Sequence, residues 1–438
     1  MKRWIGFGIG AAAMALVVTA NLAAQDSVPP VDQGVRVGIE YTPGIRPRLV
    51  VFPGPGFDSA RSIMQRDLDY SDRFELIYVG DHQDGASSAG VNYDLYRRLG
   101  AQYGVEFTPS GSATVIRLHD LDAGEVRSHQ TVIFPPPDAP EFRMAVHQVS
   151  DEIVRWVTGI PGYAASRLVY VGRKRLWSVD SDGVRNRPLT GDNETVLSPA
   201  WSPDGRRIAY TRFGEGTGSL QILFLSSGST VTVPNTRDGL NYASAFSPDG
   251  RTLAYTRSAE GGTDIFRVDI GDMCCLQRLT VGRYADNLSP TYSPDGRRIA
   301  FVSTRAGPPQ IYVMSADGTD QELLASFDFG ATGSSFAPQW SPDGAQVAFH
   351  RAVEGRFQVF VLDLASRRVR QLTSAGRNED PTWAPDGRHV AFVSTRSGRR
   401  QLWIVDTETG RIRQLGTPDA VRLPSWSSRF GGAAGVNH

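Results

Sequence analysis

The stretch Trp201-Ser-Pro-Asp-Gly-Arg-Arg-Ile-Ala-Tyr210 decides the fold, because closely related stretches return along the chain. Its proline recurs at positions 203, 248, 294, 342 and 385, so the intervals are 45, 46, 48 and 43 residues. A period in the forties that is built on strand-like segments is typical of the blades of a β-propeller. The sequence therefore predicts a repeated sheet unit for most of the chain.

The Ser-Pro-Asp-Gly core of the repeat has the chemistry of a tight turn. Proline presets φ at the first corner, aspartate accepts hydrogen bonds from nearby backbone, and glycine tolerates a positive φ at the exit. Apolar triplets such as residues 208–210 follow the turn, which predicts a hairpin. A second apolar run and a short segment, which tends to end in Leu-Thr, complete each period. Each repeat thus supplies the four strands of one blade.

The two ends of the repeat region supply the parts of one further unit. Residues 167–170 read as a strand with no Ser-Pro-Asp-Gly hairpin before it, and Pro424-Ser-Trp-Ser427 repeats the segment that precedes that hairpin elsewhere. A C-terminal strand that completes the first blade would remove exposed sheet edges. We therefore expect a six-bladed β-propeller over residues 161–430, closed by the C-terminal strand, and a tail at 431–438.

The first 160 residues have a different organisation. Lys2 and Arg3 precede an uncharged, mostly apolar run that small residues close, which predicts a cleavable secretory signal peptide over residues 1–24. Residues 25–33 are polar and contain two adjacent prolines, as in an extended arm. Residues 34–160 mix strand and helix patterns, with helices expected at 57–69, 93–103 and 141–158. The fold class is therefore multidomain: a small mixed α/β domain followed by an all-β propeller.

The composition and the few reactive residues exclude several functions. Lys+Arg and Asp+Glu both number 46, so no basic face is indicated and nucleic acid is not an expected partner. Cys274 and Cys275 are adjacent, a spacing that disfavours a disulfide, so we expect one thiol on each face of a blade's last strand. The histidines are scattered, and no metal or cofactor is predicted. His147 and Asp151 could form a catalytic pair, but a helix-surface pair or an interdomain contact is favoured.

Short polar loops precede the first strand of several repeats. In each loop an asparagine stands three residues before a second recurring proline position, which is 244 (occupied by serine), 290 or 381. Loops at this place in every blade converge on one rim of the central channel. Either the asparagine bonds to backbone in a turn or cap, or the loops form a polar ring that receives a segment of a partner. The candidate rim residues are Leu240, Asn241, Tyr242, Asp286, Asn287, Leu288, Asn378, Glu379 and Asp380.

These features, in this order, resemble the TolB family of the Tol-Pal cell-envelope system. The resemblance covers nearly the whole chain and is carried by the repeat hairpins and by four further segments. Mild departures, at Ser244, Ala384 and Ser428, leave the fold untouched, although contacts with partners can differ there. The four segments are Ile63-Met-Gln-Arg-Asp-Leu-Asp-Tyr-Ser-Asp-Arg-Phe74, His147 with Asp151, Thr158-Gly-Ile-Pro-Gly162 and Pro424-Ser-Trp-Ser427.

The resemblance implies a monomeric, non-enzymatic adaptor in the periplasm that has no cofactor and reaches membranes through its partners. It implies that the propeller rim binds a Pal-like peptidoglycan-associated lipoprotein, in support of outer-membrane integrity and cell division. It also implies that the N-terminal arm binds a TolA-like inner-membrane protein. The arm residues concerned are Gln25, Asp26, Val35, Arg36 and Val37.

Two other classes of function are alternatives. Propellers also cap serine peptidases that resemble prolyl oligopeptidase, but such an enzyme needs a Gly-x-Ser-x-Gly nucleophile elbow. The sequence contains no such motif, so at most a remnant of a peptidase of this kind is expected. A periplasmic propeller that binds an ion or a carbohydrate is harder to exclude, because channel loops with Asp and Asn could supply the ligands.

Overall fold

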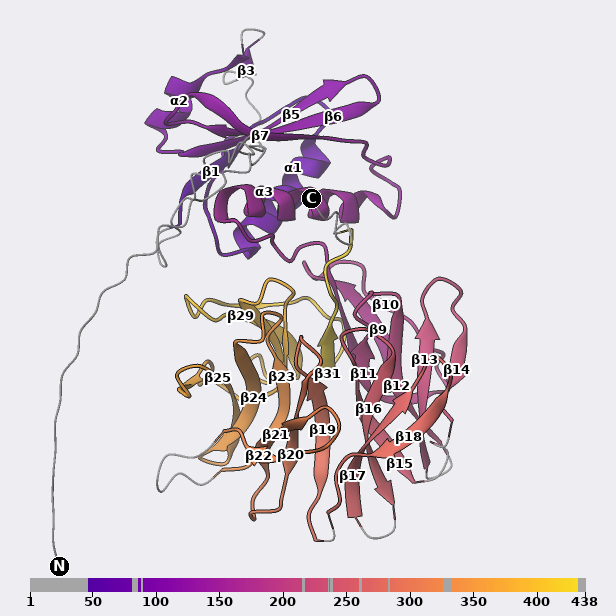
Figure 1. Ribbon diagram of the computed structural model, residues 1–438. Helices are drawn as coiled ribbons and strands as arrows, with labels where there is room; N and C mark the ends of the chain where they lie inside the picture. The colour runs from indigo at the N-terminus through magenta and orange to yellow at the C-terminus, as the bar shows by residue number, and fades with distance from the viewer. Residues whose placement is uncertain are drawn as a thin grey trace, which may run out of the picture. The chain divides into compact units, whose positions relative to one another are not determined.

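In the computed structural model, an α/β part is followed along the chain by the sheets of a propeller (Figure 1). In the described part of the chain, no helix is long and apolar enough to cross a membrane. The predicted signal peptide at 1–24 and the arm at 25–33 lie outside the described residues. The structure describes residues 46–80, 86–87, 90–214, 217–234, 236, 239–259, 262–282, 284–325 and 333–431.

A five-stranded sheet with the order β2-β1-β5-β6-β7 forms the N-terminal part. Strand β1 pairs in parallel with β2 and β5, whereas β5, β6 and β7 pair as antiparallel neighbours. The strands are β1 (Arg48–Val51), β2 (Glu75–Ile77), β5 (Tyr103–Ser110), β6 (Ala113–Asp120), β7 (Glu125–Val132) and the separate pair β3 (Ala86–Ser87) and β4 (Gly90–Val91). The helices are α1 (Asp58–Tyr70), α2 (Tyr93–Arg98) and α3 (Phe142–Thr158).

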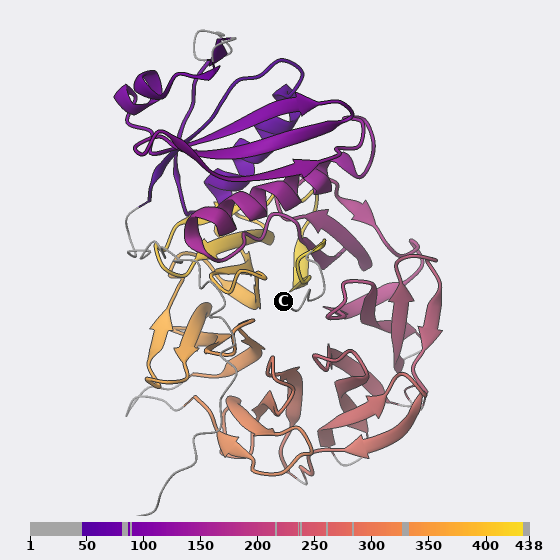
Figure 2. The same cartoon turned by 45° about the horizontal axis from the view of Figure 1, so that its top comes forward.

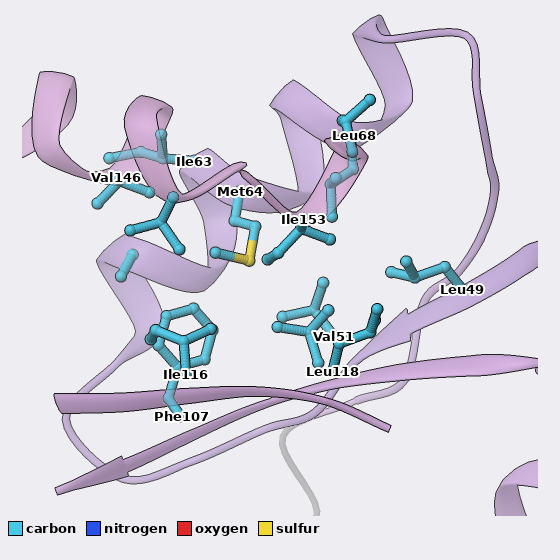
Figure 3. Packing of buried hydrophobic residues seen from close by; sticks show 14 of the residues in the cluster. Leu49, Val51, Ile63, Met64, Leu68, Phe107, Ile116, Leu118, Val146 and Ile153 are labelled. Carbon is cyan, nitrogen blue, oxygen red and sulfur yellow. The ribbon is translucent and has the colours of Figure 1, made fainter. Parts of the chain in front are cut away.

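Helices α1 and α3 pack together against this sheet, and their apolar side chains meet those of the strands (Figure 3). Met64 of α1 and Ile153 of α3 are fully buried there, together with Val51, Ile116 and Leu118 of the strands. Burying a side chain of this size contributes roughly 1.5–3 kcal/mol. The 3.6-residue spacing of apolar positions in α3 therefore decides which of its faces is turned toward the sheet.

The prediction of a helix over residues 93–103 is wrong in its second half. Helix α2 begins after Asn92, whose side chain accepts a hydrogen bond from the Leu95 N–H at 3.1 Å. The chain leaves the helix through Gly100, which has a φ of +82°. The Gln102 N–H then donates to the Arg48 carbonyl, so sheet pairing with β1 prevails over helix propensity.

The propeller sheets are arranged around a common centre (Figure 2). Four of them are separate four-stranded sheets, with the orders β10-β9-β8-β31, β19-β20-β21-β22, β23-β24-β25-β26 and β27-β28-β29-β30. Their strands are β8 (Arg167–Gly172), β9 (Arg175–Asp180), β10 (Arg187–Pro188), β31 (Val421–Trp426), β19 (Asn287–Tyr292), β20 (Arg298–Ser303), β21 (Gln310–Ser315), β22 (Glu322–Leu323), β23 (Ser335–Trp340), β24 (Gln346–Val353), β25 (Arg356–Asp363), β26 (Val369–Gln371), β27 (Asn378–Trp383), β28 (His389–Ser394), β29 (Gln401–Asp406) and β30 (Ile412–Gln414).

The prediction of a six-bladed propeller is wrong: the described propeller strands form four four-stranded sheets and one eight-stranded sheet, which two repeats share. Strand β13 pairs in parallel with β15 through Gly218 and Leu240. A Cβ added to Gly218 would lie 2.7 Å from Leu240 Cδ1, so the absence of a side chain allows the two strands to approach. The strands of this sheet are β11 (Thr195–Trp201), β12 (Arg207–Gly214), β13 (Thr217–Phe224), β14 (Thr230–Thr232), β15 (Leu240–Phe246), β16 (Thr252–Ala259), β17 (Gly262–Asp269) and β18 (Cys274–Arg278).

The Ser-Pro-Asp-Gly turns have the chemistry that the sequence indicates. In the first turn, Asp204 Oδ1 accepts from the Arg206 N–H at 3.0 Å, and the Gly205 N–H donates to the Ser202 carbonyl at 2.9 Å. Gly205 has a φ of +66°. Asp249, Asp295 and Asp343 accept the corresponding N–H in later turns. The turn residues therefore satisfy their own polar groups.

The C-terminal strand β31 pairs antiparallel with β8, the first strand of the propeller. Trp426 lies at its end, and the indole N–H donates to Ser166 Oγ at 2.8 Å. The inner strands β11, β15, β19, β23, β27 and β31 then contact one another in sequence around the centre, and β31 also contacts β11. Chain segments more than 200 residues apart in sequence thus form a single sheet.

The two cysteines form a disulfide, so the expectation of two thiols on opposite faces is wrong. They lie in β18, the last strand of its repeat. A regular strand would point neighbouring side chains to opposite faces. Cys275 instead has a φ of +62°, which removes this alternation.

Candidate partner-binding site

The predicted rim residues lie at or next to the N-terminal ends of three inner strands, β15, β19 and β27. Asn241 is in β15, Asn287 in β19 and Asn378 in β27. A Ser-Pro-Asp-Gly turn follows the C-terminal end of β15 and of β19, and Ala384-Pro-Asp-Gly follows that of β27. Each asparagine is buried, with at most 1 % of its surface exposed. The asparagines therefore lie beneath the rim surface rather than on it.

Asn287 connects its strand to the preceding repeat. Its Nδ2 donates to Asp264 Oδ1 at 2.9 Å, and Asp264 belongs to strand β17. Its Oδ1 accepts from Arg305 Nη2 at 3.1 Å. Asp264 Oδ1 also accepts from Thr280 Oγ1 and from the Gly282 N–H. The amide of Asn287 thus completes a polar network between two repeats, where an unpaired group would be costly.

The other two asparagines make the same kind of connection. Asn241 Nδ2 donates to the Gly218 carbonyl of β13 at 2.9 Å. Asn378 Nδ2 donates to Gln358 Oε1 of β25 at 2.7 Å, and its Oδ1 accepts from Arg396 Nη2 at 3.3 Å. The structure therefore favours a structural role for these amides, as inter-repeat hydrogen-bonding groups that hold the loops in place.

The neighbours of the asparagines supply the accessible surface. Asp286 is exposed, and Leu240, Tyr242 and Leu288 are partly exposed. Glu379 is 9 % exposed and accepts from the Arg377 guanidinium at 2.6 Å. It also pairs with the Arg400 guanidinium at 3.1 Å. The surface around the strand ends thus combines acidic, basic and apolar groups.

Sequence reasoning missed a set of arginines that lie beside the rim. Arg305 and Arg396 follow β20 and β28, and their guanidinium groups bond to Asn287 and Asn378. Each also stacks on aromatic rings of its own repeat, as Arg305 does on Tyr312 at 4.9 Å. The recurring Ser-Thr-Arg at 303–305 and 394–396 was the sequence signal that could have identified them.

Asp380 is a predicted rim residue that also borders a cavity between the inner strands. It lines a cavity of about 100 Å³ with residues from other inner strands. Its Oδ2 accepts from the Leu423 N–H at 3.3 Å, and its own N–H donates to His350 Nδ1 at 3.1 Å. Burial and the neighbouring Glu379 raise the pKa of Asp380 to about 6. The site therefore holds one acid that titrates in a mildly acidic range.

The equivalent positions of the inner strands share an unusual backbone conformation. Asp380 has a φ of +53°, and each of these residues directly precedes the proline within its inner strand, or Ser244 where that proline is replaced. The ladders shift register at these points, as β-bulges do. Five of them also border the cavity with Asp380: Ser198, Ala243, Ser289, Ala337 and Leu423.

His147 and Asp151 do not form a pair with each other. His147 is fully buried, and its Nδ1 lies 2.8 Å from Asp67 Oδ2 on α1. Asp151 accepts from the backbone N–H groups of Ala164 and Ala165, and burial raises its pKa to about 7. The interpretation as a helix-surface pair is wrong for both residues. Asp151 instead connects α3 to the segment that leads into the propeller.

Asp72, His389 and Asp406 approach one another closely enough to resemble a metal site. Asp406 is already bonded to the Arg388 guanidinium, at 2.7 and 2.6 Å, and to Thr409. Arg411 bonds to Asp72 at 2.8 Å. Two arginines beside these carboxylates supply the positive charge that a cation would bring. The group is therefore an ion-pair network between the α/β part and the propeller.

A family model described as the TolB beta propeller domain matches residues 154–330 and 321–433. These ranges include more than half of the chain. The chain belongs to the TolB family. The resemblance that the sequence indicates is thereby confirmed, and the chain is a Tol-Pal system protein. TolB-family membership also agrees with the prediction that it is not an enzyme.

Individual TolB relatives support this assignment. The Tol-Pal system protein TolB of Bordetella parapertussis is 32% identical over 322 residues, which are 70% of this chain and 71% of that protein. The TolB of Methylococcus capsulatus is 34% identical over 257 residues, so this match spans only 57% of the relative. The crystal structure of TolB from Acinetobacter baumannii superposes with a TM-score of 0.77 at 26% identity, covering 88% of this chain and 98% of that one.

Proposed function

We propose that this chain is a periplasmic adaptor that connects a Pal-like outer-membrane lipoprotein to a TolA-like inner-membrane protein. The observation that carries the proposal is the fixed rim at the first ends of β15, β19 and β27. Its loops are held by buried amides such as Asn287, so a partner would bind there with little loss of conformational entropy. TolB-family membership supports the assignment to the Tol-Pal system.

The Pal-like lipoprotein would contact the accessible side chains of the rim. Asp286, Arg305 and Arg377 are exposed and present charges of both signs. Tyr242 and Leu288 add partly exposed apolar surface. A surface of this composition suits a partner with complementary charges around an apolar centre. The asparagines would act indirectly, by fixing the loops that carry these groups.

The TolA-like protein would bind the N-terminal arm. Residues 25–33 are polar and proline-containing, and the arm leads into the alternating stretch that begins at Val35. Gln25, Asp26, Val35, Arg36 and Val37 lie outside the described residues, so this part of the proposal rests on the sequence and its family resemblance. The predicted signal peptide at residues 1–24 would deliver the chain to the periplasm.

The test compares two substitutions with the same change of charge. Asp286→Lys alters an exposed rim residue, whereas Asp272→Lys alters an exposed residue at the opposite end of the propeller strands. Soluble Pal-type lipoprotein from the same organism, without its lipid, is titrated into each protein. Asp286→Lys should weaken binding by tenfold or more, because like charges placed opposite each other across an interface cost several kcal/mol. Asp272→Lys should bind as the unaltered protein does.

A second experiment distinguishes the binding sites of the two partners. Deleting residues 25–34 should abolish binding to the TolA-type protein. The shortened protein should still bind the Pal-type lipoprotein. Equal affinity of Asp286→Lys, Asp272→Lys and the unaltered protein for the lipoprotein would show that the rim is structural. Retained TolA binding after deletion of the arm would reject the arm as its site.

A further inference from the structure

The disulfide between Cys274 and Cys275 lies on an accessible strand of the propeller. Strand β18 has five residues, all of them exposed. It pairs with β17 on one side and is the last strand of its sheet in the strand order. Both cysteine residues can therefore be approached from solution without unfolding of the propeller.

Strand β18 differs from the other outer strands in its register. Between the pairs Arg267–Gln277 and Asp269–Cys274, β17 advances by two residues and β18 by three. The extra residue on β18 is a β-bulge. The outer strands β10, β14, β22, β26 and β30 pair with their neighbours without such a shift in the described residues. The bulge thus coincides with the disulfide.

The backbone on both sides of Cys274 adopts a left-handed conformation. Met273 has a φ of +53° and Cys275 a φ of +62°. Side-chain-bearing residues adopt this region uncommonly, and such positions persist where the surrounding structure imposes them. A covalent ring that joins two neighbouring residues is such a constraint, because it fixes the backbone between them.

The covalent chemistry of neighbouring cysteines favours exchange. Disulfides usually join residues whose Cα atoms are about 4.4–6.8 Å apart, and departures from this geometry make the bond easier to reduce. Adjacent residues cannot reach that range, since their Cα atoms lie 3.8 Å apart. Exposed or constrained disulfides are the labile and regulatory ones, whereas buried relaxed ones are structural.

We propose that Cys274–Cys275 is a thiol–disulfide exchange site whose redox state sets the conformation of β18. Its reaction partner is a dithiol. One thiolate of the dithiol attacks a cysteine sulfur, the S–S bond breaks, and the second thiolate resolves the mixed disulfide. The products are two protein thiols and an oxidised dithiol, so two electrons pass from the dithiol to the protein. Reduction opens the ring and frees the backbone of β18 at the bulge.

The first experiment measures access to the bond in the folded, full-length protein. The protein is treated with iodoacetamide before and after incubation with dithiothreitol, and carbamidomethyl groups are counted by mass spectrometry. We expect no modification before reduction and two modifications after it. Modification only in denaturant would show a protected structural bond. Modification without reductant would show that the bond is absent, and either result would overturn the proposal.

The second experiment measures the coupling to β18. Amide hydrogen exchange is compared between oxidised and reduced protein, with the regular outer strand β26 as an internal control. Reduction should accelerate exchange at residues 274–278 by about tenfold or more, because local opening needs less free energy once the ring is broken. Exchange at residues 369–371 should not change. The Cys275→Ser variant, which cannot close the ring, should exchange like the reduced protein, and unchanged exchange at 274–278 on reduction would reject the coupling.

Discussion

The imidazole of His389 in β28 lies 3.2 Å from Asp72 Oδ2, in the turn that follows α1. Its other ring nitrogen lies 2.7 Å from Asp386 Oδ2. Arg388, one residue earlier, donates to the Asp72 carbonyl and to the carboxylate of Asp406. A buried ion-pair network thus joins the α/β part to the propeller, and one titratable histidine lies at its centre.

This histidine should make stability depend on pH. Burial lowers the pKa of His389, but Asp386, Asp72 and Asp406 together raise it above the ordinary value of 6.5. The stabilisation is therefore complete below pH 6.5 and is lost as the pH rises through the raised pKa. We expect His389→Gln to lower the melting temperature more at pH 6 than at pH 9. The exposed His129 provides the control, since His129→Gln should have little effect at either pH.

Removing the Asn287 side chain should destabilise the propeller. Asn287→Ala leaves the buried Asp264 carboxylate without one donor and Arg305 without one acceptor. Losing a partner of a buried polar group costs about 1–3 kcal/mol. Asp286→Ala, one residue away and exposed, should remain within about 0.5 kcal/mol. Urea unfolding of both variants measures the difference, and equal midpoints would refute the inter-repeat role of the amide.

Ionisation of Asp380 should lower the stability of the folded protein, whereas ionisation of a carboxylate in an ion pair raises it. Its pKa is raised from 3.8 to about 6, so the folded protein holds a proton that the unfolded chain has released. Ionisation therefore removes stability as the pH rises from about 4 to about 6. Asp380→Asn should raise the melting temperature at pH 7.5 and change it little at pH 4, since Asn still accepts from the Leu423 N–H. An equal shift at both pH values would contradict this.

Truncation should show how much the C-terminal strand contributes. Deletion from Arg422 onward removes most of β31, so β8 keeps its pairing with β9 but becomes an unpaired edge on its other side. It also removes Trp426, whose indole bonds to Ser166. We expect a protein that is insoluble or rapidly cleaved by protease. Deletion of residues 432–438 is the control, and a soluble first truncation with unchanged melting would disprove closure through β31.

The sequence by itself determined the repeat and its turns. Proline, aspartate and glycine act within four residues of one another, so the turn at Asp204 follows from local chemistry. The period then indicates a propeller, and the helical spacing in α3 identifies its buried face. The position of each asparagine was also visible, because it recurs at a constant distance from the repeat proline.

Only the tertiary structure decided what those positions do. Whether Asn287 is exposed depends on Asp264 in β17 and on Arg305 in the turn after β20, and no local pattern encodes these contacts. The pairing of β13 with β15 depends on how closely two repeats approach at Gly218, which is a matter of packing. The bond between Cys274 and Cys275 needed a bulge that regular strand geometry excludes. Long-range contacts, rather than propensities, therefore set the sheet boundaries and the role of the rim amides.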